Sequence, residues 1–241
     1  MQPQLSHQAM GYDRTSTMFS PDGRLLQVEY AKKTVKQGTN AIGIVCKDGV
    51  VLVADKRISE KLIVGESVEK VFQVDIHIGA IASGIISDAR VLIERAQVVA
   101  QQHKITFDTP IDLQSLVRDI CNVKQYYTQV GGARPFGVSI LFGGIDTNES
   151  SPRLFLTDPT GIFFEFKATA IGESEGEIKE ILEKEYRDNI SVDEGVKLAL
   201  RALKKVLGKE FDMVRMDGAY IMSDEKDFTR LTQDMLSKYK L

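Results

Sequence analysis

Apolar and polar positions along the chain follow two different periods, and these predict blocks of helices separated by blocks of strands. Apolar residues recur every three or four positions in the predicted helices, and they alternate or run continuously in the predicted strands. The helices are predicted at 21–36, 87–103 and 110–127, and after Ser174, Ser191 and Thr229. The strands are predicted at 41–46, 50–54, 68–74, 76–82, 137–143, 153–157, 162–169 and 219–222.

Short polar signals mark where several of these elements begin. Ser20 suits the N-cap of the first helix, and Pro21 suits its first helical position. Ser174 and Ser191 each precede a glutamate by three residues, which is the capping-box pattern of a helix start. Asp-Gly at 48–49 is a strong hairpin signal between the first two strands.

The order of these elements predicts the fold class. Strands and helices arrive in blocks and do not alternate strictly, which disfavours a doubly wound sheet. The strands at 41–46 and 50–54 are apolar throughout, as expected when both faces are covered. We therefore expect an α+β fold, a four-layer αββα sandwich of two antiparallel sheets flanked by helix pairs, with an extra N-terminal helix. No Pro, Gly or Ser run interrupts residues 21–241, so one domain is expected after an N-terminal tail at 1–20.

Composition excludes several classes of function. The net charge of −3 argues against nucleic-acid binding, which needs clustered positive charge, and disfavours an RNA-associated protein. Cys46 and Cys121 lie in apolar segments, so we expect them to be buried free thiols. The histidines His7, His77 and His103 are far apart in the sequence and form no metal-binding pattern. No metal and no cofactor are expected. No apolar run is long enough to span a membrane, and the polar N-terminus is no secretory signal, so we expect a cytoplasmic protein without membrane contact.

The best candidate for chemistry is a threonine with an acid and a lysine. Thr39 opens the first predicted strand, Asp55 closes the second, and Lys70 lies on the third, so adjacent strands bring their ends together. A threonine hydroxyl needs a base, and a free α-amino group serves when the threonine is the first residue of the chain. Two interpretations follow. Either Thr39 is structural, or cleavage between Gly38 and Thr39 makes it a nucleophile. A disposable leader has no need of a capped amphipathic helix, so the structural interpretation is favoured.

Several segments resemble one known family. Tyr12-Asp13-Arg14 and the run FSPDGRLLQVEYA (Phe19 to Ala31) are similar to the signature of proteasome α-type subunits. The similarity extends over GTNAIGIVCKDGVVLVADKR (Gly38 to Arg57), SGIISDAR (Ser83 to Arg90) and GGARPFGVSILFGG (Gly131 to Gly144). It covers nearly the whole chain, and the N-terminal signature is highly specific.

The resemblance implies the sandwich of N-terminal-nucleophile hydrolases, assembled into heptameric rings for protein degradation. Two α rings would cap two β rings, which carry the threonine protease activity, and unfolded protein substrates would pass through. Thr39, Asp55 and Lys70 align with the nucleophile, acid and lysine of the β relatives. In an α subunit these would be vestigial positions, so the chain is expected to be no enzyme. The alternative is a β-type threonine peptidase precursor cleaved before Thr39. Whether the ring is homomeric stays open, with a single α type favoured.

The resemblance also implies a gate, meaning a tail that closes the axial pore of the ring. By position, the gate residues would be Tyr12, Asp13, Arg14, Pro21 and Tyr30. The alternative is a plain disordered terminus.

A further implication is a pocket between neighbouring α subunits that binds the C-terminal carboxylate of an ATPase activator. Lys70 would pair with that carboxylate, with Leu25, Gly38 and Gly84 lining the pocket; the alternative for Lys70 is an ordinary ion pair. Val130 departs from the family, where an aromatic residue precedes the glycine pair near the pore, so the pore lining is left open.

Overall fold

A computed structural model describes residues 11–58, 62–146 and 151–239. Two five-stranded antiparallel sheets lie face to face, in the orders β10-β9-β2-β1-β8 and β3-β4-β5-β6-β7. The strands are β1 (Ala41–Cys46), β2 (Gly49–Asp55), β3 (Val71–Asp75), β4 (Ile78–Gly84), β5 (Val138–Ile145), β6 (Pro152–Thr157), β7 (Phe163–Glu165), β8 (Ala168–Ile171), β9 (Met216–Met222) and β10 (Phe228–Arg230). The helices are α1 (Leu26–Gln37), α2 (Ile86–Phe107), α3 (Leu113–Tyr127), α4 (Glu175–Glu185), α5 (Val192–Leu207) and α6 (Gln233–Ser237), with 3₁₀ turns at Gly65–Ser67, Gly208–Glu210 and Met213–Arg215.

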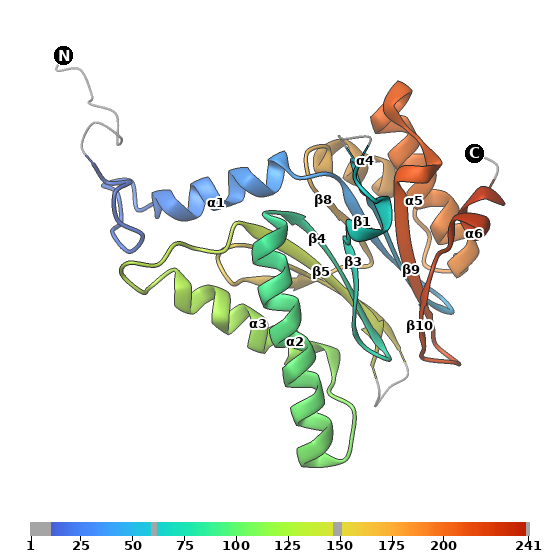
Figure 1. The fold of residues 1–241 in the computed structure, drawn as a ribbon, viewed down its shortest axis with the longest axis horizontal. Helices are drawn as coiled ribbons and strands as arrows, with labels where there is room; N and C mark the ends of the chain where they lie inside the picture. The colour runs from blue at the N-terminus through green and yellow to red at the C-terminus, as the bar shows by residue number, and fades with distance from the viewer. Residues whose placement is uncertain (1–10, 59–61, 147–150, 240–241) are drawn as a thin grey trace.

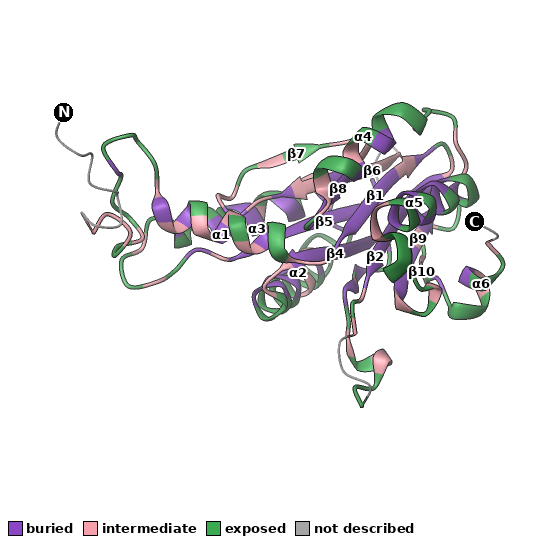
Figure 2. Ribbon diagram, turned by 90° about the horizontal axis from the view of Figure 1, so that it is seen from above, coloured by how far each residue is buried: buried purple, intermediate pink, exposed green. Residues whose placement is uncertain are grey.

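Three layers of buried apolar side chains hold the sandwich together. The central layer lies between the sheets and includes Leu52 and Leu141. A second layer packs α2 and α3 on the sheet that contains β4 and β5, and a third packs α4 and α5 on β1 and β2. Helices therefore cover the outer face of each sheet, while α1 packs on β4 and β5 and carries the N-terminal segment outward (Figures 1 and 2). The predicted four-layer α+β sandwich with an extra N-terminal helix is confirmed.

The first helix begins five residues later than predicted. It starts at Leu26, and its N-cap, Leu25, makes no side-chain capping bond. Ser20 instead begins a tight turn, in which its carbonyl accepts the Gly23 N–H at 2.8 Å and Gly23 takes a φ of +73°. Pro at the second position and Gly at the fourth are typical of such a turn, so Pro21 is a turn residue and the helix-start interpretation was wrong.

The strand predicted at 162–169 is two strands, and they belong to different sheets. β7 pairs with β6, whereas β8 pairs with β1. The chain thus crosses from one sheet to the other between Glu165 and Ala168. The structure also adds a strand that was not predicted, β10 at the edge beside β9, and the last helix begins only after Thr232, which caps it.

The two capping predictions had different outcomes. Ser191 and Glu194 form the complete capping box of α5, whereas the Ser174 side chain makes no capping bond to α4. The predicted hairpin between the first two strands forms, but its turn lies one residue earlier than the Asp48-Gly49 signal: Lys47 and Asp48 make the turn, and Gly49 begins β2 opposite Cys46. Among the helices that the structure describes, none is long and apolar enough to cross a membrane.

Candidate functional site

Thr39 and Lys70 meet where α1 leads into β1. The Lys70 Nζ donates to the Thr39 hydroxyl, to the Thr39 carbonyl at 3.1 Å and to the Asp55 carbonyl at 3.3 Å. The Thr39 hydroxyl in turn donates to the Asp55 carbonyl at 2.7 Å. The three predicted residues are therefore brought together. However, Asp55 takes part through its main chain.

The carboxylate of Asp55 faces Arg215, which the sequence interpretation missed. Arg215 donates through Nε to Oδ1 at 3.0 Å and through Nη2 to Oδ2 at 2.8 Å, a bidentate pair. The Asp55 side chain is fully buried, so it needs such a cation. Arg215 lies 160 positions away in a short 3₁₀ turn, and no local pattern marks it.

Lys70 is buried, and its environment changes its charge. Only 4% of the residue is exposed. Burial lowers the pKa of Lys70 to about 8, although the nearby Asp55 charge acts in the opposite direction. The amine donates to the Thr39 hydroxyl, and the proton of that hydroxyl goes to the Asp55 carbonyl, so Lys70 does not take the position of a base towards Thr39. The Thr39 nitrogen is an amide within the chain that leaves α1, so the site also lacks the α-amine that would serve as base.

Two glycines allow the end of α1 to abut β4. A Cβ on Gly38 would lie 2.4 Å from the Gly84 nitrogen, and one on Gly84 would lie 2.2 Å from the Gly137 carbonyl oxygen. Gly84 also has a φ of +116°, a backbone angle that residues with a Cβ rarely adopt. Ser83 joins this contact, because its hydroxyl donates to the Thr39 carbonyl at 2.9 Å.

Three of the four predicted pocket residues thus share one region, since Lys70, Gly38 and Gly84 all surround Thr39. Leu25 does not join them. It precedes α1, and Gly38 follows that helix, so the two are about 20 Å apart at 1.5 Å per residue. Leu25 is able to complete such a pocket only from a neighbouring copy of the chain.

The predicted gate residues are only partly assembled. The Tyr30 hydroxyl donates to Asp13 Oδ2 at 3.4 Å, and the Gln27 amide donates to the Asp13 carbonyl at 2.5 Å. Tyr12 and Arg14 flank Asp13 in a turn in which the Arg14 N–H donates to the Gly11 carbonyl at 3.1 Å. Pro21 lies in its own exposed turn, as described above. Residues 1–10 of the predicted tail lie outside the described residues.

The loop with the predicted glycine pair lies beside this segment. The Ser16 hydroxyl donates to the Val130 carbonyl at 3.3 Å, which brings the N-terminal segment against the start of the loop. Within the described residues, no group of acidic, histidine and cysteine side chains could hold a metal ion.

Comparison with known proteins agrees with this fold and site. Residues 35–218 match the family described as proteasome subunit, and residues 12–33 match the N-terminal signature of proteasome α-type subunits. The chain is 47% identical to the proteasome alpha subunit of Archaeoglobus fulgidus, over 95% of this chain and 92% of the relative. It is 50% identical to the proteasome alpha subunit of Methanocaldococcus jannaschii, over 94% of this chain and 86% of the relative.

The chain therefore belongs to the proteasome subunit family. Its N-terminal signature and its relatives are of the α type, as the sequence predicted. A β-type precursor is not favoured, and the non-catalytic role of an outer-ring subunit fits the site.

Proposed function

We propose that the chain is a non-catalytic α subunit, which forms the outer heptameric ring of a proteasome core particle and controls substrate access to it. The observation that carries this proposal is the packing of α1 directly before Thr39. Leu26, Val28 and Val35 on α1 are buried, and a fully buried side chain of this kind contributes about 1.5–3 kcal/mol. Cleavage before Thr39 would remove this helix from the core, so Thr39 keeps its amide and has no base of its own.

The gate is the second part of the proposal. Tyr12, Asp13, Arg14, Pro21 and Tyr30 would hold the tail at 1–20 in the open state. The hydrogen bond from Tyr30 to Asp13 supports this role, because it ties the tail to α1. The turn at Pro21 fixes the direction in which the tail leaves the helix.

Activator docking is the third part. Lys70, Gly38 and Gly84 would form one wall of a pocket, and Leu25 of the next copy would form the other. The C-terminal carboxylate of an ATPase activator would bind Lys70, whose side chain would have to turn from Thr39 to reach it. β subunits and unfolded protein substrates are the other partners, in the cytoplasm, with no nucleic acid and no membrane.

Electron microscopy and peptide hydrolysis together test the proposal. The purified chain, alone and with a β subunit, should form seven-membered rings, and peptide hydrolysis should appear only with the β subunit. The intact mass of the chain in the particle should include the residues before Thr39. A chain that starts at Thr39 and hydrolyses peptides by itself would refute the proposal.

A further inference from the structure

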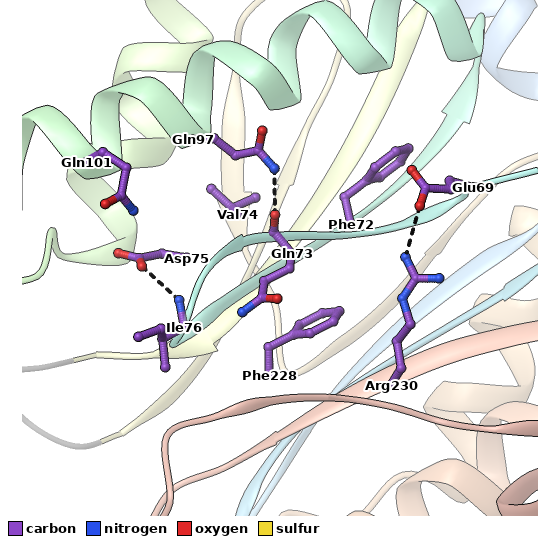
Figure 3. A pocket seen from close by; sticks show the side chains of 10 residues that line it. All are labelled: Glu69, Phe72, Gln73, Val74, Asp75, Ile76, Gln97, Gln101, Phe228 and Arg230. Atoms are coloured by element: carbon purple, nitrogen blue, oxygen red, sulfur yellow. Dashed lines mark hydrogen bonds and ion pairs between the residues drawn. The ribbon is translucent and has the colours of Figure 1, made fainter. Parts of the chain in front are cut away.

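The outer edge of β3 contains none of the gate or pocket residues named above. Among the strands that the structure describes, β3 is the last of its sheet and pairs only with β4. An open trough of about 750 Å³ runs beside it. Side chains from α2 form one wall of the trough and side chains from β10 form the other (Figure 3).

Side chains, not a neighbouring strand, satisfy the carbonyl groups on this edge. The Val71 carbonyl accepts from Arg230 Nη2 at 2.7 Å, and the Gln73 carbonyl accepts from Gln97 Nε2 at 2.8 Å. In an antiparallel strand the N–H and C=O of one residue point to the same side, so the N–H groups of Val71 and Gln73 face the trough as well. The two side chains occupy the places where the N–H groups of an added strand would lie.

One end of the edge already binds main chain. The Phe228 N–H donates to the Ile76 carbonyl at 2.8 Å, just beyond the end of β3. β3 itself has five residues, which span about 17 Å at 3.4 Å per residue. The register of β3 with β4 is regular from Val71 to Gln73 and shifts between Gln73 and Asp75, so the regular part of the free edge has room for about three residues of another extended chain.

Two phenylalanines line the trough on opposite sides of β3. Phe72 is half-buried and packs towards the layer beneath α2. Phe228 is half-buried on the other side, and its ring covers Gly79, where a Cβ would lie 2.9 Å from it. An extended chain in the trough would thus meet an apolar ring on each of its two faces.

Charge adds little selectivity to the trough. Glu69 and Arg230 form an ion pair at 3.6 Å across one end, and the Asp75 carboxylate accepts the Ile76 N–H at 2.8 Å at the other. A weakly charged segment suits these surroundings better than an acidic or a basic one. Side chains of β-branched and aromatic type suit an edge with apolar contacts on both faces.

We propose that the β3 edge binds an extended, weakly charged polypeptide segment rich in β-branched and aromatic residues, which adds to the sheet as a further strand. Gln97 and Arg230 turn away, and main-chain groups of the segment replace them, as in other cases of strand addition. This inference needs neither the gate nor the binding of a carboxylate at Lys70, so it stands or fails independently of both.

Fluorescence anisotropy with the purified full-length chain tests the inference. The probe is a fluorescein-labelled peptide of alternating valine and threonine, and the control probe is the same peptide with alternate amides N-methylated. Gln73→Pro removes the outward N–H, and an edge strand tolerates proline where the N–H faces away from its partner strand. Gln73→Ala is the matched variant, because it shortens the same side chain and keeps the N–H. Circular dichroism confirms that both variants fold.

The wild type and Gln73→Ala should bind the probe within about twofold of each other, whereas Gln73→Pro and the methylated probe should each weaken binding at least about tenfold. Gln97→Ala should bind more tightly than the wild type, since no side chain then competes for the Gln73 carbonyl. Equal binding by Gln73→Pro, or of the methylated probe, would overturn the inference. So would a wild type that does not bind the probe. Self-association of the chain that Gln73→Pro abolishes would also overturn it, in favour of an interface between two copies.

Discussion

Docking of an activator carboxylate at Lys70 should weaken as pH rises above neutrality. Burial lowers the pKa of Lys70 to about 8, from an ordinary value of 10.5. Only the protonated ammonium attracts a carboxylate, and this form is present below pH 8 and lost above it. A carboxylate that has bound keeps the proton on the amine, so the pH dependence reflects the unoccupied site.

The magnitude follows from the protonated fraction. With a pKa of about 8, about ten in eleven of the amines are charged at pH 7 and about one in eleven at pH 9. The affinity should therefore fall about tenfold over this range, which is about 1.4 kcal/mol. A lysine with the ordinary value of 10.5 would stay charged throughout and show almost no change.

Anisotropy titration of a labelled C-terminal peptide from an ATPase activator, against particles assembled with a β subunit, measures this dependence. The same peptide with an amidated C-terminus is the ligand control. Lys70→Arg is the matched variant, because a guanidinium keeps its charge at every pH used and its affinity should stay flat. Lys70→Met should leave ring assembly intact and abolish activator-stimulated hydrolysis. An affinity of the wild type that does not change between pH 7 and pH 9 would refute the reasoning.

Three further predictions concern Thr39, Gly84 and the buried Lys124 of α3, whose ammonium donates to the Val138 carbonyl at 3.0 Å and to the Thr157 hydroxyl at 2.9 Å. Thr39→Ala should leave peptide hydrolysis by particles assembled with a β subunit unchanged, and loss of that activity would show that the hydroxyl reacts. Gly84→Ala should lower the free energy of unfolding in urea by about 2 kcal/mol or more, because its Cβ would lie 2.2 Å from a backbone oxygen, whereas Gly176→Ala, with nothing within 4 Å, should not. Burial lowers the pKa of Lys124 to about 8, from an ordinary value of 10.5. Between these two pH values the unfolded chain binds more protons than the folded chain, so the free energy of unfolding rises with pH. The difference in unfolding free energy between wild type and Lys124→Met should rise by about 1.3 kcal/mol from pH 7 to pH 9, and a flat or falling difference would contradict this assignment.

The fold was predictable where local signals decide it. Continuous apolar runs such as 41–46 and 50–54 require cover on both faces, and the blocks of strands and helices then leave few arrangements. The helix start at Ser191 was predictable because serine and glutamate complete each other's hydrogen bonds within one turn. These signals lie within a few residues of the structure that they specify.

The errors arose where distant partners or competing turns decide the outcome. Residues 162–169 read as one strand, but β7 and β8 pair with strands of different sheets, and no local pattern reports which partner each one has. Ser20 and Pro21 suit a helix start and a tight turn equally well. Gly23, which accepts a positive φ, favours the turn.

The same distinction applies to the candidate site. Thr39 and Lys70 were expected to meet because hairpin strands bring their ends together, and their side chains do meet. The partner of the Asp55 carboxylate was missed, because Arg215 comes from the far end of the chain. A carboxylate buried at a strand end requires a cation, but the sequence does not say which of many arginines and lysines supplies it.

The junction that these residues hold together accounts for their burial without any catalytic role. The Lys70 ammonium has three donors, and its three acceptors are the Thr39 hydroxyl and the carbonyls of Thr39 and Asp55. A buried carbonyl without a partner costs free energy, so the lysine stabilises the place where α1, β1, β2 and β3 meet. The same side chains would serve a reacting threonine only if its nitrogen were a free amine. The buried face of α1 keeps that nitrogen in an amide, so the retained lysine is evidence of packing and not of catalysis.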